Sequence, residues 1–138
     1  MAKKSSSEGG TYERLHFSAT KTWQRACDLY VQIQAQLATV ETESAQLIKS
    51  HLAISLEDIA LRVALGVDTL AREQKKHFFH QAIEACVAAQ SYLLLANAAN
   101  LFDLTSFNDE LEILIRQIAA NIGHLNENSK TVTVDNPS

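Results

Sequence analysis

Three side chains that could bind a metal follow one another in the second half of the chain. His77, His80 and Glu84 are three and four residues apart, so a helix would place them on one side. Two imidazoles and one carboxylate form a ligand set that zinc accepts. The same residues would also make the polar sector of an amphipathic helix, which is the commoner arrangement. The pattern therefore favours an exposed helix surface over a metal site.

Other patterns that support catalysis are sparse. The chain has four glycines, two of them adjacent near its start, and it contains no glycine-rich phosphate loop, nucleophile elbow or CxxC pair. A di-iron bundle needs two Glu-x-x-His motifs, and the sequence has one, from Glu13 to His16. We predict no catalytic, cofactor-binding or metal-binding residues, and a protein that is not an enzyme.

The cysteines and one further histidine have structural explanations. Cys27 and Cys86 lie within apolar helical patterns, and free cysteine is among the most buried residue types. Two buried thiols without a disulfide framework are typical of a reducing, cytoplasmic location. His51 lies between two apolar sets of one predicted helix. A hydrogen-bonded interface histidine is favoured there over a catalytic base.

A basic run follows the middle of the chain, with Glu73 as its one acid. An ordinary solvated helix start is favoured, and a patch for phosphate or a partner is the alternative. The whole chain carries 12 Lys and Arg against 16 Asp and Glu, a net charge of −4, so any nucleic-acid binding should be weak and salt-sensitive. The residues of the run are Arg72, Lys75, Lys76, His77 and His80.

The elements that carry these residues are predicted to be helices only. Apolar residues recur at helical spacing in four segments, 18–40, 43–70, 75–99 and 106–125. Ser18 and Ser106 are predicted to begin the first and last of them. Four helices of similar length with short links predict an all-α, antiparallel up-down-up-down four-helix bundle over residues 15–125. Residues 1–14 and 126–138 are predicted to be disordered tails, and no apolar run is long enough to span a membrane.

The segment 43–70 has two apolar sides. One side should face the bundle core, and its residues are Ala45, Ile48, Leu52, Leu56, Ile59, Val63, Gly66 and Leu70. The opposite side carries Leu47, Ile54, Leu61 and Leu65. A helix at the edge of a small bundle needs one apolar side. The second side therefore predicts an interface between subunits of a homo-oligomer.

Several stretches resemble the four-helix-bundle proteins encoded in 23S ribosomal RNA intervening sequences. In FSATKTWQRACDL, the residues Phe17, Trp23, Gln24, Ala26 and Leu29 match the opening of that family in register. KKHFFHQAIEACVAAQSYL is similar to its third helix, and LFDLTSFNDELEILIRQIAANIGHL to its last loop and helix. The family's signature in the second helix is replaced here by SLEDIALRVALG.

The resemblance has implications for assembly. Its relatives include accessory variability proteins of diversity-generating retroelements, which are pentameric and bind a reverse transcriptase and nucleic acid. The resemblance thus implies a pentamer and a reverse transcriptase as a candidate partner. From the residues, we expect a non-enzymatic, self-assembling bundle that acts as an adaptor or scaffold for a protein partner. The alternative is a nucleic-acid-binding accessory protein that works with a reverse transcriptase.

Overall fold

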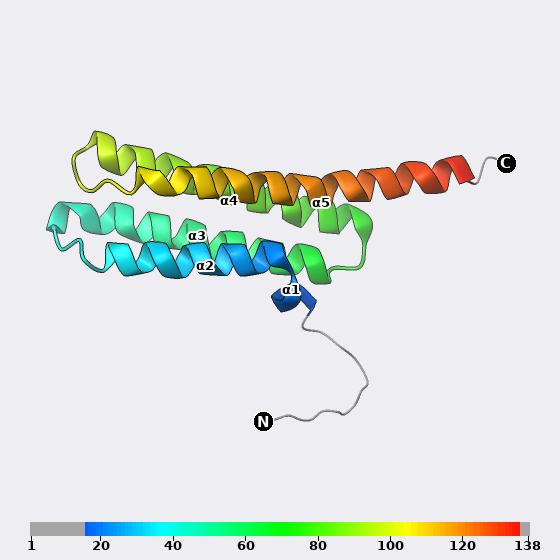
Figure 1. Ribbon diagram of the computed structural model, residues 1–138, viewed down its shortest axis with the longest axis horizontal. Helices are drawn as coiled ribbons and strands as arrows, with labels where there is room; N and C mark the ends of the chain where they lie inside the picture. The colour runs from blue at the N-terminus through cyan, green and yellow to red at the C-terminus, as the bar shows by residue number, and fades with distance from the viewer. Residues whose placement is uncertain (1–15, 136–138) are drawn as a thin grey trace, which may run out of the picture.

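The four long helices of the chain pack against one another along most of their length (Figure 1). The structure is a computed structural model that describes the backbone of residues 16–135 and the side chains of residues 16–127. Within that range the chain is helical and contains no strand, which confirms the predicted all-α class. The α-helices are α1 (His16–Ala19), α2 (Lys21–Leu37), α3 (Gln46–Asp68), α4 (Arg72–Ala98) and α5 (Asn108–Asp135), with short 3-10 helices at Glu43–Ala45 and Thr105–Phe107.

The first long helix begins at Lys21, and the prediction that Ser18 begins it was wrong. The backbone of Thr20 is extended, and its hydroxyl accepts a hydrogen bond from the N–H of Trp23. The same hydroxyl donates to the carbonyl of Phe17 at 2.7 Å. Thr20 therefore closes α1 and caps α2, because one hydroxyl can donate to one turn and accept from the next.

The helix α3 ends at Asp68, and Lys75 satisfies its last carbonyl groups. The ammonium of Lys75 donates to the carbonyls of Gly66 and Val67 at 2.6 and 2.7 Å. Thr69 is extended, so Leu70 leaves the helix and is 96% exposed. The prediction that Leu70 belongs to the core was wrong, because helical spacing predicts burial only while the helix continues.

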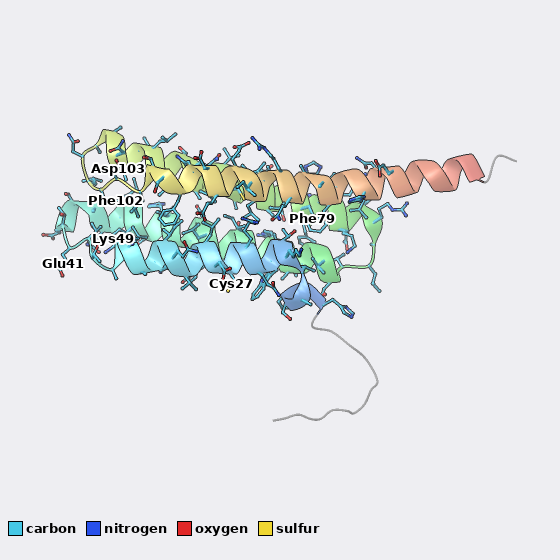
Figure 2. The ribbon with its side chains drawn as sticks, viewed as in Figure 1. Cys27, Glu41, Lys49, Phe79, Phe102 and Asp103 are labelled. Atoms are coloured by element: carbon cyan, nitrogen blue, oxygen red, sulfur yellow. The ribbon has the colours of Figure 1, made fainter. Side chains whose placement is uncertain are left out.

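The link from α4 to α5 turns sharply and lies against the core. Asn100 has a φ of 59°, in the left-handed region that asparagine tolerates at helix ends. Phe102, labelled in Figure 2, and Leu104 are half-buried against the core. The carboxylate of Asp103 accepts from both the N–H and the hydroxyl of Thr105, which lowers the pKa of Asp103. The 3-10 helix begins at Thr105 and α5 begins at Asn108, so the predicted helix start at Ser106 was wrong by one to two residues.

The core is aliphatic and lies between all four long helices. Predicted core residues of α3, including Leu52, Leu56 and Val63, are almost completely buried. Ile48 is only half-buried. The largest fully buried side chains are Leu29, Ile33, Leu52, Leu56, Ile59, Val63, Cys86, Leu93, Leu111, Leu114 and Ile118. Burial of such side chains contributes about 1.5–3 kcal/mol each before entropy is counted, so this layer holds the helices together.

One close contact in the core involves a glycine. A Cβ added at Gly66 of α3 would lie 2.6 Å from Cε1 and 2.7 Å from Cδ1 of the Phe79 ring. Phe79 itself is 3% exposed and points into the bundle (Figure 2). The absence of a side chain at position 66 thus allows α3 and the first turns of α4 to approach each other.

The structure describes the backbone from residue 16 to residue 135 at the two ends of the chain. The predicted N-terminal tail, residues 1–14, lies outside the described residues. The helix α5 continues to Asp135 and extends beyond the ends of the other helices (Figure 1). The sequence predicted that this helix ends at residue 125 and that a disordered tail follows. The helix runs further than the apolar pattern indicated.

Candidate functional site

The outer face of α3 carries three of the large apolar side chains that are exposed in the described part of the chain. Leu47, Ile54 and Leu61 are 71%, 63% and 52% exposed and are seven residues apart. Leu65, the fourth member predicted for this face, is half-buried. We call Leu47, Ile54, Leu61 and Leu65 the outer stripe. The structure places it on the side of α3 that faces away from the core.

Leu47, Ile54 and Leu61 of the outer stripe lie outside the core of the monomer, whereas Leu65 is half-buried. The opposite side of α3 supplies Leu52, Leu56, Ile59 and Val63 to the core, each at most 2% exposed. The flanks of α3 pack on α2 and α4. A side chain exposed by half or more leaves much apolar area in water, and a row of such side chains commonly marks an interaction surface.

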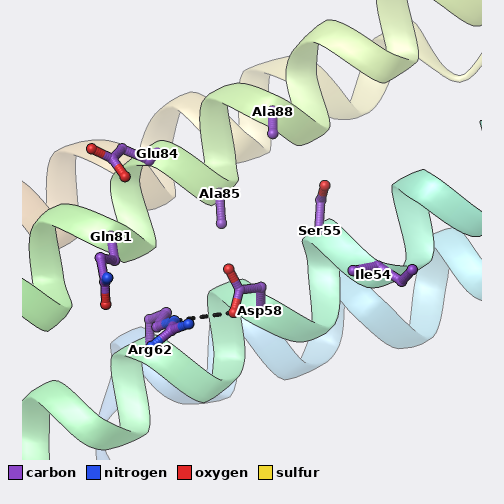
Figure 3. A pocket seen from close by; sticks show the side chains of 8 residues that line it. All are labelled: Ile54, Ser55, Asp58, Arg62, Gln81, Glu84, Ala85 and Ala88. Carbon is purple, nitrogen blue, oxygen red and sulfur yellow. Dashed lines mark hydrogen bonds and ion pairs between the residues drawn. The ribbon is translucent and has the colours of Figure 1, made fainter.

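A hollow of about 280 Å³ lies beside Ile54, between α3 and α4 (Figure 3). Small side chains make it, because Ser55, Ala85 and Ala88 leave space where the two helices run side by side. Its polar end holds an ion pair in which Nε of Arg62 donates to Asp58 at 3.1 Å. The hollow is lined by Ile54, Ser55, Asp58, Arg62, Gln81, Glu84, Ala85 and Ala88.

An unpartnered acceptor lies at the same hollow. The side-chain oxygen of Gln81 is buried and has no hydrogen-bond partner within the described residues. An unpaired buried acceptor costs about 1–3 kcal/mol, and a donor from outside would recover that cost. Sequence reasoning missed this hollow. Its one signal was the spacing of Ala85 and Ala88 on α4, but its existence depends on which α3 residues lie opposite them.

His51 is hydrogen-bonded as predicted, and its partner is Tyr92 of α4. The Tyr92 hydroxyl lies 3.4 Å from Nδ1 of His51, and the two ring centroids are 5.4 Å apart. When Tyr92 donates to Nδ1, the proton of the imidazole is on Nε2, which then acts as a donor. Both residues lie on the same side of the α3–α4 pair as the outer stripe.

The basic run does not converge on one surface. Lys75 turns toward the end of α3, and burial lowers its pKa, an effect that the charge of Asp68 partly offsets. Lys76 lies 3.4 Å from Glu73 and donates to Asn126 of α5 at 3.1 Å. Arg72, His77 and His80 are exposed. These contacts leave less cationic surface than the sequence indicated, and nucleic-acid binding by this patch stays a prediction.

Over the described residues, no group of three or more His, Cys, Asp or Glu side chains is placed to bind a metal ion, and this includes His77, His80 and Glu84. Glu13, the first residue of the Glu-x-x-His motif, lies outside the described range. No helix between residues 16 and 135 is both long enough and apolar enough to cross a bilayer.

The two cysteines differ in accessibility. Cys86 is completely buried, and desolvation, with the charge of Glu112, raises the pKa of its thiol to about 12. Cys27 is half-buried on α2, beside a hollow of about 300 Å³ that Trp23 and Tyr30 help to line. Both thiols are free, in agreement with the sequence prediction of no disulfide.

We expect Cys27 to react readily with a thiol reagent and Cys86 to react only when the protein unfolds. Thiolate is the reactive form, and burial suppresses it at Cys86. Because the folded pKa of Cys86 is raised above its ordinary value of 9.0, its contribution to stability is complete below about pH 9 and is lost as the pH rises toward 12. Timed labelling with a disulfide reagent, with and without denaturant, measures the reaction rates of the two thiols. Equal rates for Cys27 and Cys86 in the folded protein would contradict this expectation.

Comparisons with known proteins found no matching family model, no similar curated protein and no similar solved structure.

Proposed function

We propose that this protein is a non-enzymatic, self-assembling four-helix bundle that acts as an adaptor or scaffold for a protein partner. The observation that carries the proposal is the outer stripe. Three large aliphatic side chains on one helix remain more than half exposed although the core is complete without them. Apolar area exposed in this way is stabilised when a second surface covers it.

The proposal includes the antiparallel up-down-up-down order of the helices. Cross-helix hydrogen bonds support this order. Gln90 of α4 bonds to Glu112 of α5, whereas Lys76, earlier on α4, bonds to Asn126, later on α5. The course of the ribbon in Figure 1 agrees with it. Helices that lie side by side along their length give a rod with a continuous outer face. Such a face suits a subunit that stacks against others.

The experiment that tests self-assembly is a mass measurement in solution. Size-exclusion chromatography with light scattering, over a range of protein concentrations, should give a mass above that of one 15.2 kDa chain. The mass should fall toward one chain on dilution, because assembly obeys mass action. A single-chain mass at all concentrations would contradict the proposal. The adaptor role is tested separately, by whether a candidate partner co-elutes with the assembled form.

A further inference from the structure

We infer that the outer stripe binds a second copy of this chain, with the two α3 helices antiparallel about a two-fold axis at the level of Ile54. This inference rests on the proposed self-assembly and specifies its geometry. Each copy would insert its Ile54 into the α3–α4 hollow of the other copy. Three independent features of the described residues carry the inference, namely the spacing of the stripe, the position of the hollow and the residues on its flanks.

The spacing of the stripe is symmetric about its centre. Leu47 and Leu61 are each seven residues from Ile54, at opposite ends of the stripe. In an antiparallel pair centred on Ile54, Leu47 of each copy therefore meets Leu61 of the other. A repeat of seven residues keeps such a seam in contact when two helices cross at about 20°. The stripe is thus complementary to itself under a two-fold rotation.

The hollow lies next to the residue that would fill it. Ile54 is 63% exposed, and it lines the rim of the hollow made by Ser55, Ala85 and Ala88 (Figure 3). A projecting side chain beside a recess is the arrangement that a two-fold axis requires, because the same patch must serve both subunits. With the axis at the level of Ile54, the Ile54 side chain of each copy lies against the end of the other copy's recess that Ile54 and Ser55 line.

The flanks of the stripe are polar and also match under the rotation. His51 and Asp58 lie on one flank, and Ser50 and Glu57 on the other, when α3 is projected at about 100° per residue. A two-fold axis perpendicular to the helices brings like flanks together. The His51 of one copy then lies at the level of Asp58 of the other copy, and Ser50 lies at the level of Glu57.

The chemistry of these flank pairs is complementary. When the Tyr92 hydroxyl donates to Nδ1 of His51, Nε2–H of His51 is a donor toward a carboxylate. One oxygen of Asp58 accepts from Arg62, and one of Glu57 accepts from Tyr30 at 3.2 Å, so each carboxylate keeps a second oxygen. A polar rim that is hydrogen-bonded around an apolar centre is typical of specific interfaces.

A dimer that uses both α3 and α4 has more area to bury than the outer stripe alone provides. Specific interfaces bury roughly 800 Å² on each partner, more than three aliphatic side chains provide. The α4 residues beside the stripe extend it. Leu95 is 53% exposed and lies one turn after Tyr92, whereas Leu47 lies one turn before His51, so the two leucines are at the same level of the helix pair.

Cysteine cross-linking tests the two-fold arrangement. Three variants, Leu47→Cys, Ile54→Cys and Leu61→Cys, would be made in a Cys27→Ser chain, with the buried Cys86 left unchanged. A short bifunctional thiol reagent should link Ile54→Cys to itself. It should link Leu47→Cys to Leu61→Cys when the two are refolded together. Each of these two alone should give no product, since copies of one position are about 21 Å apart at 1.5 Å per residue.

A second pair of positions keeps the apolar seam intact. Ser50→Cys and Glu57→Cys, mixed and oxidised, should form one disulfide between the two variants, because that bond needs Cα atoms within about 7 Å. Either variant alone should remain uncross-linked. This pair tests the arrangement even if the assembly is lost when Ile54 or a leucine of the stripe is replaced by cysteine.

The outcomes separate this inference from the proposed function. Light scattering on the unsubstituted protein is measured in parallel. An assembled protein in which Leu47→Cys links to itself would have α3 helices side by side and parallel. An assembled protein without any Ile54→Cys self-link would use two different faces, as a ring of five does. Either result overturns the two-fold inference and leaves self-assembly standing. A single-chain mass overturns both.

Discussion

Replacing Ile54 and Leu61 together by aspartate is expected to dissociate the assembly and leave each subunit folded. In a subunit interface the two new carboxylates would be desolvated without partners. An unpaired buried charge costs about 3–5 kcal/mol, which is at least a hundredfold in the dissociation constant. In the isolated subunit both positions are exposed by half or more, so the change in its free energy of unfolding should be small. Light scattering measures the first effect, and circular dichroism with thermal unfolding measures the second.

The matched control makes the same chemical change on other helices. Val31 of α2 and Ile113 of α5 are 58% and 41% exposed. The pair Val31→Asp and Ile113→Asp adds the same charge and removes similar apolar area, and we expect it to keep the assembled mass. An assembly that survives Ile54→Asp with Leu61→Asp would show that the outer stripe is not the interface. Dissociation by both pairs would point to charge repulsion instead.

Alanine at two helical glycines is expected to have opposite effects on stability. Gly66→Ala would place a methyl group 2.6 Å from the Phe79 ring in the core. Overpacking costs about 1–3 kcal/mol, and the gain in helix propensity returns about 1 kcal/mol, so a net loss of about 1 kcal/mol is expected. A Cβ at Gly123 of α5 meets nothing within 4 Å. Gly123→Ala should therefore stabilise the protein by about 0.5–1 kcal/mol.

Urea unfolding at one protein concentration measures both variants, with concentration fixed because assembly adds to apparent stability. Repeating the Gly66→Ala measurement in a Phe79→Leu variant tests whether the contact with the Phe79 ring causes the loss of stability. Phe79→Leu removes the ring atoms nearest to position 66, so Gly66→Ala should cost less in that background, with a coupling of about 1 kcal/mol. Equal costs in both backgrounds would show that the loss at position 66 has another origin.

The sequence predicted the helices and the burial of α3 well, for a physical reason. The two sides of α3 follow from helical periodicity alone, so the core residues Leu52, Leu56 and Val63 and the exposed Leu47, Ile54 and Leu61 were all placed correctly. Helix ends were predicted less well. Thr20 caps α2 with its hydroxyl, and Asp103 accepts hydrogen bonds from Thr105 at the start of the 3-10 helix. Such side chains are common enough that Ser18 and Ser106 looked equally suitable.

Features that depend on how two helices pack against each other could not be predicted from the sequence of either helix alone. The hollow beside Ile54 exists because Ser55 lies opposite Ala85 and Ala88, and the register of α3 against α4 is a property of the packed structure. Likewise, the charge of Lys75 pointed to a patch for partners. Lys75 lies in the first turn of α4, where its ammonium reaches carbonyls at the end of α3 and donates to them.

The lysines at two of the links also bear on the order in which the chain folds. Lys49 of α3 donates to the carbonyl of Val40, and Lys75 of α4 donates to that of Gly66, each across nine residues of sequence. The contact that joins the first and last long helices, from Arg25 to Gln117, spans 92 residues. Closing the longer loop costs about 2 kcal/mol more in chain entropy. The α2–α3 and α3–α4 hairpins should therefore form early, and the docking of α5 on α2 should complete folding.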